Sequence, residues 1–212
     1  MPCDLYVITD ETLAGGLPHV EIARRAVAGG ADVVQLRDKT LGCRDLVRIG
    51  KEIKETTAPA GALFIVNDRL DVAIACGADG VHLGQGDISP GVARQLAPPC
   101  FIIGVSVGDV DEARQAEVEG ADYLALSPTF DTASKHDAGP GRGLGRLREI
   151  RKAVHIPVIA IGGIGPANVQ DVIRSGADGV AVISAVVSAP DITKAARELR
   201  SLIARAKAEK DR

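Results

Sequence analysis

The chain has almost no aromatic side chains. Its 212 residues include no Trp, two Tyr and three Phe. Without aromatic stacking platforms, and with a net charge of −3, the chain lacks the features of a nucleic-acid-binding protein. The core must therefore be aliphatic, and 46% of the residues are hydrophobic. Val, Ile, Leu and Ala are typical of parallel strands that are buried on both faces.

Long apolar segments are also missing. No apolar run approaches the ~18 residues of a membrane-spanning helix, and the acidic start MPCDLYVITD is unlike a signal peptide. The four cysteines, at positions 3, 43, 76 and 100, lack the spacing of a metal site. We therefore expect a cytoplasmic protein with reduced thiols and no membrane partner.

The tripeptide Gly-Ala-Asp, in contrast, is repeated four times, beginning at Gly30, Gly77, Gly120 and Gly176. Each copy closes a helical pattern, because glycine supplies the left-handed residue that ends a helix. Each copy is followed by an apolar run: VVQL, GVHL, YLAL and GVAV. Four more apolar runs lie between them, at 5–8, 63–66, 101–105 and 158–161. The sequence therefore predicts eight strands, every second one preceded by this tripeptide.

Helical patterns fill the gaps, at 20–28, 44–56, 69–76, 91–96, 110–119, 144–154, 167–175 and 192–206. Strict alternation of strands and helices indicates an all-parallel sheet. Eight such units predict an α/β fold in which residues 1–212 form a single (β/α)8 TIM barrel. An open doubly wound sheet is the alternative, and the fourfold repeat makes it less consistent with the sequence.

In such barrels the active site lies at the C-terminal ends of the strands. Gln35, Arg37 and Lys39 alternate along the second strand and so share one face. A closed parallel sheet leaves no solvated face, so this polar set is predicted to point into the barrel mouth. Two cations there indicate a phosphate or diphosphate ligand.

Two carboxylates follow the next two strands. Asp68 comes after the run at 64–66 and Asp87 after the run at 81–83, so both are expected at one edge of the sheet. Such a pair suits Mg²⁺, which usually takes one or two carboxylates together with water and substrate phosphate. Alternatively, Asp68 is the N-cap of the helix that follows it.

The remaining strand ends carry hydroxyls and glycines. Ser106 ends the fifth strand and is a weak signal by itself. The glycine-rich loop 128–145 is long enough for a lid, and its hydroxyls and lysine would either clamp an anion or form a solvated turn. Gly162-Gly163 and Ser184 follow strands seven and eight, where these barrels commonly bind phosphate, although the glycines would also serve a simple turn. His82, inside a strand, is more typical of a packed core residue.

The mouth is therefore predicted to hold two anion sites of different character. One has carboxylates, Arg and Lys and suits a metal-bound diphosphate, and the other has glycine backbone and a serine and suits a monophosphate. An enzyme that joins two phosphorylated molecules with loss of diphosphate needs both. It needs no activated nucleophile, because metal and cations stabilise the leaving charge.

Seven motifs along nearly the whole chain resemble those of the thiamine-phosphate synthase family. They are QLRDK at 35–39, ND at 67–68, VHLGQGD at 81–87, GVS at 104–106, TASK at 132–135, AIGGI at 160–164 and VIS at 182–184. The resemblance implies a transferase that condenses hydroxymethylpyrimidine diphosphate with thiazole phosphate, giving thiamine phosphate and diphosphate. In that family diphosphate leaves first, and the thiazole nitrogen captures the pyrimidine-methyl cation.

The resemblance also implies roles for individual residues. Asp68 and Asp87 would bind Mg²⁺, and the catalytic residues would be Arg37, Lys39, Ser106 and Lys135. The substrate-binding residues would be Gln35, Arg37, Asp38, Lys39, Asn67, Ser106, Thr132, Ala133, Ser134, Lys135, Gly163, Ile183 and Ser184. Gln35, Arg37, Lys39, Asn67 and Lys135 would hold the pyrimidine diphosphate and Ser106 its ring. Thr132, Ala133, Ser134, Gly163, Ile183 and Ser184 would hold the thiazole phosphate. The expected partners are these small molecules, and a homo-oligomer is left open.

The chain departs from the family pattern at three places. Gly86 stands where an acidic residue is common, and Asp131 stands where proline is common. Val107-Gly108 replaces a common threonine-histidine pair. Two alternatives remain. A thiazole tautomerase-like isomerase would require a histidine shortly after Ser106 and would not need Asp87. A noncatalytic phosphate-binding barrel would have lost part of the metal and cation set, which is complete here.

Overall fold

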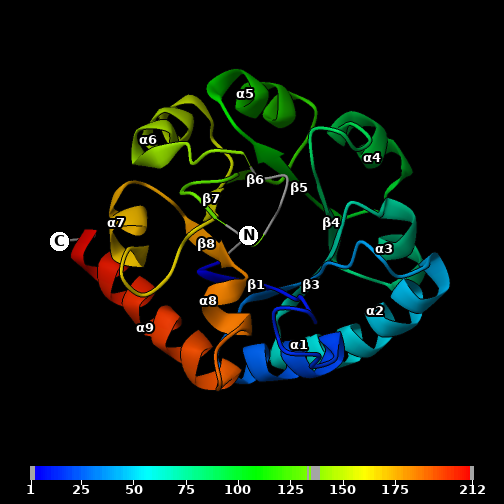
Figure 1. Cartoon of the computed structure of the whole chain (residues 1–212). Coiled ribbons are helices and arrows are strands. Elements are labelled where there is room, and N and C mark those ends of the chain that lie inside the picture. Colours follow the sequence, from blue (N-terminus) through cyan, green and yellow to red (C-terminus); the bar gives the residue numbers. More distant parts are fainter. Residues whose placement is uncertain (1–2, 133, 135–138, 211–212) are drawn as a thin grey trace.

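The fold is a closed barrel of eight parallel strands in the part of the chain that the structure, a computed structural model, describes: residues 3–132, 134 and 139–210. Neighbours in sequence pair with each other, and β8 pairs with β1 to close the ring (Figure 1). The strands are β1 (Leu5–Ile8), β2 (Val33–Leu36), β3 (Leu63–Asn67), β4 (Gly80–Leu83), β5 (Ile102–Val107), β6 (Tyr123–Leu126), β7 (Val158–Ile161) and β8 (Gly179–Val182). The predicted (β/α)8 barrel is confirmed.

Helices surround the strands on the outside of the barrel (Figure 1). They are α1 (His19–Ala28), α2 (Cys43–Thr57), α3 (Leu70–Cys76), α4 (Pro90–Leu96), α5 (Val110–Val118), α6 (Gly143–Ala153), α7 (Val169–Arg174) and α9 (Ile192–Lys210). All eight were predicted, most to within one residue at each end. A 3-10 turn (Ala58–Ala60) and the four-residue helix α8 (Ser184–Val187) were not predicted, because neither is long enough to show a period.

The four Gly-Ala-Asp repeats form four identical clamps between neighbouring strands. The backbone N–H of each aspartate donates to a carbonyl of the preceding strand, and the same aspartate's Oδ2 accepts the N–H of that same residue. Asp79, for example, bonds Phe64 in both directions at 2.8 Å. The four pairs are Asp32 with Leu5, Asp79 with Phe64, Asp122 with Ile103 and Asp178 with Val158.

Each clamp also carries a cation from a surrounding helix. Lys54 Nζ lies 2.5 Å from Asp79, Arg94 Nη2 lies 2.6 Å from Asp122 and Arg151 Nε lies 3.5 Å from Asp178. Arg200 pairs with Asp32 in the same way. The aspartates stand just before strands β2, β4, β6 and β8, so the clamps lie at the end of the barrel opposite the strands' C-terminal ends. The repeat therefore stabilises the base of the barrel and leaves its mouth free for a site.

The strands themselves are almost wholly buried, as expected for a parallel sheet covered by helices and filled by its own side chains. In the part of the chain that the structure describes, no helix is long and apolar enough to cross a membrane.

Candidate active site

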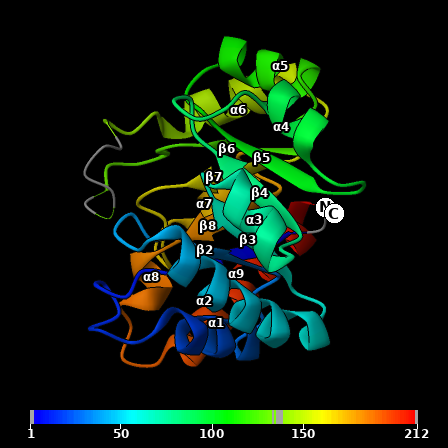
Figure 2. The same cartoon turned by 90° about the vertical axis from the view of Figure 1, so that its right-hand side faces the viewer.

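Among the cavities that the described residues form, two share Ser127 at the C-terminal ends of the strands. The described ends of the loop after β6 project from the same side (Figure 2). The large cavity, about 460 Å³ in volume, is polar. It is lined by Arg37, Lys39, Asn67, Asp68, His82, Gly84, Gln85, Gly86, Asp87, Ser106, Val107, Gly108, Glu112, Ser127 and Arg142. The structure therefore brings together six of the predicted site residues from strands β2 to β5.

The two predicted cations of β2 reach this cavity. The side chain of Arg37 is 13% exposed, and its Nη1 lies 3.8 Å from Asp10 Oδ2 in the loop after β1. Lys39 Nζ contacts Asp68 Oδ2 directly. Both cations therefore line the cavity and are paired with carboxylates.

Asp38, which lies between them, lines neither cavity. Its Oδ1 accepts hydrogen bonds from the backbone N–H groups of Thr40 and Leu41, and its Oδ2 lies 3.2 Å from His19 Nε2. Partial burial alone would raise the pKa of Asp38, but these hydrogen bonds lower it to about 2. The geometry makes Asp38 a brace for the loop that carries Arg37 and Lys39.

Asp68 has an unusual backbone conformation. Its φ is 60°, a left-handed value that residues other than glycine seldom adopt. Helix α3 begins at Leu70 with Arg69 before it, and no side chain caps its first turn. The alternative that Asp68 is an N-cap is therefore wrong. The strained backbone instead directs the carboxylate into the cavity, as often happens at functional sites.

Asp87 lies beside Asp68. Its Oδ2 accepts the N–H of Gly84 at 2.7 Å, which closes the loop after β4. Burial raises the pKa of Asp87 above its ordinary value, and the nearby Asp68 carboxylate raises it further. Two carboxylates that repel each other fit a divalent cation. Among the described residues, no group of three or more His, Cys, Asp or Glu side chains could hold a metal ion. Two carboxylates would leave the other coordination positions to water and substrate phosphate, as Mg²⁺ sites usually do.

A chain of buried hydrogen bonds crosses the barrel interior and ends at Ser106. Gln35 Nε2 donates to Tyr6 Oη at 2.6 Å, and Tyr6 Oη lies 3.1 Å from Tyr123 Oη. Tyr123 Oη lies 2.9 Å from His82 Nδ1, and His82 Nε2 lies 2.9 Å from Ser106 Oγ. His82 is thus a hydrogen-bonded core residue, as predicted, but it also lines the large cavity and orients Ser106 there.

Gln35 lies deeper than predicted. Instead of reaching the mouth with Arg37, it is 1% exposed and lines a small internal cavity that it shares with His82. Its Oε1 is buried and has no hydrogen-bond partner among the described residues. Buried polar atoms are rarely left unpaired, and a hydrogen-bond donor on a bound ligand would satisfy this acceptor.

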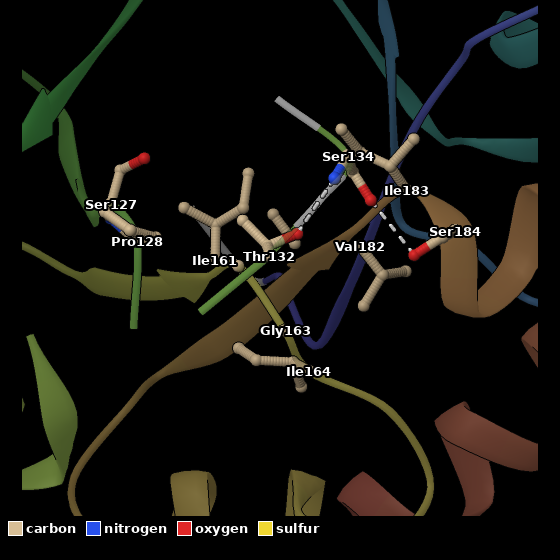
Figure 3. A pocket seen from close by; sticks show the side chains of 12 residues that line it. Ser127, Pro128, Thr132, Ser134, Ile161, Gly163, Ile164, Val182, Ile183 and Ser184 are labelled. Carbon is tan, nitrogen blue, oxygen red and sulfur yellow. Dashed lines mark hydrogen bonds between the residues drawn. The ribbon is translucent and has the colours of Figure 1, made fainter. Parts of the chain in front are cut away.

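The second cavity, here called the glycine cavity, lies at the ends of β6, β7 and β8 (Figure 3). Its lining includes the predicted residues Thr132, Ser134, Gly163, Ile183 and Ser184, together with Ser127, which it shares with the large cavity. The Ser134 hydroxyl lies 3.1 Å from that of Ser184, and the Ser134 N–H donates to Thr132 Oγ1 at 3.2 Å (Figure 3). About 20 Å³ of this cavity is open.

The glycine pair after β7 makes room for that loop. Gly162 has a φ of 99° and Gly163 a φ of 63°. A Cβ at Gly162 would lie 2.7 Å from Pro128 Cβ, and one at Gly163 would lie 2.6 Å from Asp131 O. The glycines therefore do more than turn the chain, because they let the base of the neighbouring loop pack against β7.

Helix α6 begins at Gly143, one residue before the predicted start, so the last residues of the predicted loop 128–145 are helical. The two ends of the loop are tied together: Arg142 N–H donates to Pro128 O at 2.9 Å, and Gly141 N–H donates to Asp131 Oδ1 at 2.8 Å. Asp131, a departure from the family pattern, thus closes the loop base. Ala133 and Lys135 lie outside the described residues, so their roles stay predictions.

Besides His82, four polar side chains that line the large cavity were not among the predicted site residues: Gln85, Glu112, Ser127 and Arg142. Ser127 directly follows β6, so the rule that identified Ser106 would have found it. Gln85 donates from Nε2 to Ser106 O at 2.7 Å, and Glu112 Oε2 accepts the N–H of Gly108 at 2.6 Å. The fourth, Arg142, comes from the start of α6, and no sequence signal places it beside β5.

Known proteins share both the sequence and the barrel. The family model described as thiamine monophosphate synthase matches residues 5–186. The thiamine-phosphate synthase of Methanoculleus marisnigri is 65% identical over 209 residues, covering 99% of each chain, and that of Methanoregula boonei is 63% identical, covering 98% of this chain and 96% of the other. The solved structure of thiamine phosphate pyrophosphorylase from Pyrococcus furiosus superposes with a TM-score of 0.90 at 46% identity over 97% of each chain.

Proposed function

The chain belongs to the thiamine monophosphate synthase family, and we propose that its two cavities bind the two substrates of that reaction side by side. The activity is that of a transferase, thiamine-phosphate synthesis. It joins hydroxymethylpyrimidine diphosphate to thiazole phosphate and releases diphosphate. The observation that carries the assignment of sites is the pair of cavities that meet at Ser127, one with carboxylates and cations and the other with glycines and hydroxyls.

In this proposal the large cavity holds the diphosphate. Arg37 and Lys39 face it from β2, and Asn67 faces it from the end of β3. Charge-assisted hydrogen bonds from such groups are about twice as strong as neutral ones. Because the negative charge on the diphosphate grows as its bond to the pyrimidine-methyl carbon breaks, these cations stabilise the transition state more than the substrate.

Asp68 and Asp87 would hold Mg²⁺ beside the diphosphate. When bound, the ion neutralises charge on the leaving group. The mutual repulsion of the two carboxylates and the strained backbone of Asp68 support this assignment. The ammonium group of Lys39 contacts Asp68, and this contact orients the Asp68 carboxylate.

The pyrimidine ring would lie between Ser106 and the barrel interior. The hydroxyl of Ser106 is oriented by His82, whose other nitrogen is oriented by Tyr123. The unpaired Oε1 of Gln35 can accept a hydrogen bond from a ligand, and the exocyclic amino group of the pyrimidine would be the donor. Rigid groups of this kind fix the methyl carbon relative to the second substrate.

The glycine cavity would hold the thiazole phosphate. Gly163 and Ile183 line it together with Thr132, Ser134 and Ser184, so backbone N–H groups and hydroxyls would bind the phosphate (Figure 3). As predicted from the sequence, the loop 128–145 would act as a lid over the bound diphosphate, which would shield the reactive pyrimidine cation from water. Lys135 would reach the diphosphate from this loop, and Ala133 would contact the thiazole phosphate.

The two alternatives have no such support. The isomerase requires a histidine shortly after Ser106, and position 108 is glycine. A noncatalytic barrel would have lost residues of the cation and carboxylate set, and that set lines one cavity. We also propose a cytoplasmic enzyme, which four free thiols support.

The proposal is tested by incubating the protein with both substrates and Mg²⁺ and measuring thiamine phosphate by chromatography. Omitting either substrate, or adding excess EDTA, is expected to abolish the product. Asp68→Asn and Asp87→Asn are expected to reduce turnover strongly, while circular dichroism shows an intact fold. Full turnover of both variants in EDTA would refute the metal site, and absence of product in the parent would refute the function.

A further inference from the structure

We propose that Arg142 is an additional binding residue for the diphosphate, supplied by the base of the loop after β6. The inference rests on the proposed function, because it assumes that the large cavity holds this group. Arg142 lines that cavity with Arg37 and Lys39, although it is more than a hundred residues further along the chain. It would approach the diphosphate from the side of β5, where neither of the other two cations lies.

Gly108 creates the space for this side chain. A Cβ placed on Gly108 would lie 2.9 Å from Nη2 and 3.1 Å from Cζ of Arg142. The guanidinium therefore packs on the backbone just after β5, in the volume that any larger residue at position 108 would occupy. This contact holds the group at the cavity wall.

The backbone of Arg142 is anchored as well. Its N–H donates to Pro128 O at 2.9 Å, and the N–H of the next residue, Gly143, donates to Thr129 O at 2.8 Å. Both bonds tie the start of α6 to the other end of the loop. The guanidinium therefore extends from a fixed point, which lowers the entropy lost when it binds a ligand.

Arg142 is also the least committed cation of the cavity. Lys39 contacts Asp68, and Arg37 faces Asp10. No ion pair or side-chain hydrogen bond is found for Arg142 among the described residues, and the nearby Glu112 carboxylate accepts the N–H of Gly108. An uncommitted guanidinium fits the two oxygens of a phosphate group, because its donors form a planar fork.

The test measures the affinity for inorganic diphosphate with Mg²⁺ by calorimetry, and separately the affinity for thiazole phosphate. Arg142→Ala is expected to weaken diphosphate binding about tenfold, as for loss of a charge-assisted contact, with thiazole phosphate unchanged. Arg142→Lys is expected to recover only part of the loss, since an ammonium cannot bind two oxygens in a plane. Arg146→Ala is the matched control, because Arg146 lies on the same helix, lines neither cavity and pairs with Glu149.

Gly108→Ala is a second, independent probe. The added methyl group must displace the flexible end of Arg142. Gly108→Ala alone should therefore weaken diphosphate binding, whereas Gly108→Ala combined with Arg142→Ala should bind no more weakly than Arg142→Ala alone. Two results would overturn the inference. One is parent-like diphosphate affinity in Arg142→Ala, and the other is an equal loss for both ligands. Failure of the parent itself to bind diphosphate would instead refute the proposed function.

Discussion

Replacing Asp79 with alanine removes one clamp from the base of the barrel and should lower stability without damaging the site. Asp79 Oδ2 accepts the N–H of Phe64 at 2.8 Å, and Oδ1 lies 2.5 Å from Lys54 Nζ. The side chain of Phe64 is fully buried, and the two charged side chains are 26% and 31% exposed. The variant therefore leaves a backbone donor at the buried start of β3 without its acceptor.

The magnitude follows from these two contacts. An unsatisfied buried N–H costs about 1–3 kcal/mol. A partly screened ion pair contributes about 0.5–1 kcal/mol. Asp79→Ala should therefore lower the free energy of unfolding by roughly 2–4 kcal/mol, which is a large share of the ~5–15 kcal/mol typical of a domain. Asp79→Asn can keep the neutral hydrogen bond and should lose about half as much.

Urea unfolding measures the effect, provided that the variants unfold with equal slopes. Asp71→Ala is the control, because that carboxylate is 60% exposed and pairs with Arg69 on the surface of α3. It should change the free energy of unfolding by less than about 0.5 kcal/mol. Folded Asp79→Ala should bind both substrates normally, since the clamp lies at the opposite end of the barrel. If it loses no more stability than Asp71→Ala, the clamp interpretation is wrong.

Three further predictions concern the mouth. Asp87→Asn should reduce turnover on the order of a hundredfold. It should also slightly raise the melting temperature in EDTA, because it removes the repulsion from Asp68, and a lower melting temperature would contradict this. Arg37→Ala should raise the Kd for the pyrimidine diphosphate roughly tenfold to a hundredfold, whereas equal losses for both substrates by calorimetry would mean that the sites are misplaced. Gly163→Ala should raise the KM for thiazole phosphate and leave the affinity for diphosphate unchanged, since its Cβ would press on Asp131 O at 2.6 Å; an unchanged KM would argue against the packing of loop and strand.

The order of the elements was predictable because it depends on local rules. Apolar runs of strand length and glycines that end helices act over a few residues, so the sequence determined all eight strands. The parallel barrel then places every strand's C-terminal end at one mouth. For this reason the sequence alone predicts one shared site for five residues: Arg37, Lys39, Asp68, Asp87 and Ser106.

The direction of each side chain depended on the tertiary structure. Gln35 and Arg37 are expected on one face, but Gln35 lies two residues earlier, within β2, and so remains inside the barrel with Tyr6. Whether Asp68 capped a helix or faced the cavity was undecided from the sequence, because both use the same residue type at the same place. The left-handed backbone of Asp68 and its contact with Lys39 decided it.

Contacts between distant segments had no local signature at all. Gly162-Gly163 reads as a turn until Pro128 and Asp131 pack against it. Arg142 has the sequence signature of a residue just before a surface helix, and only the fold places its guanidinium against Gly108. The chain by itself thus determined the barrel and the place of its site. Closure of the barrel decided which side chains from separate strands and loops share each cavity, because only closure brings those segments within contact distance.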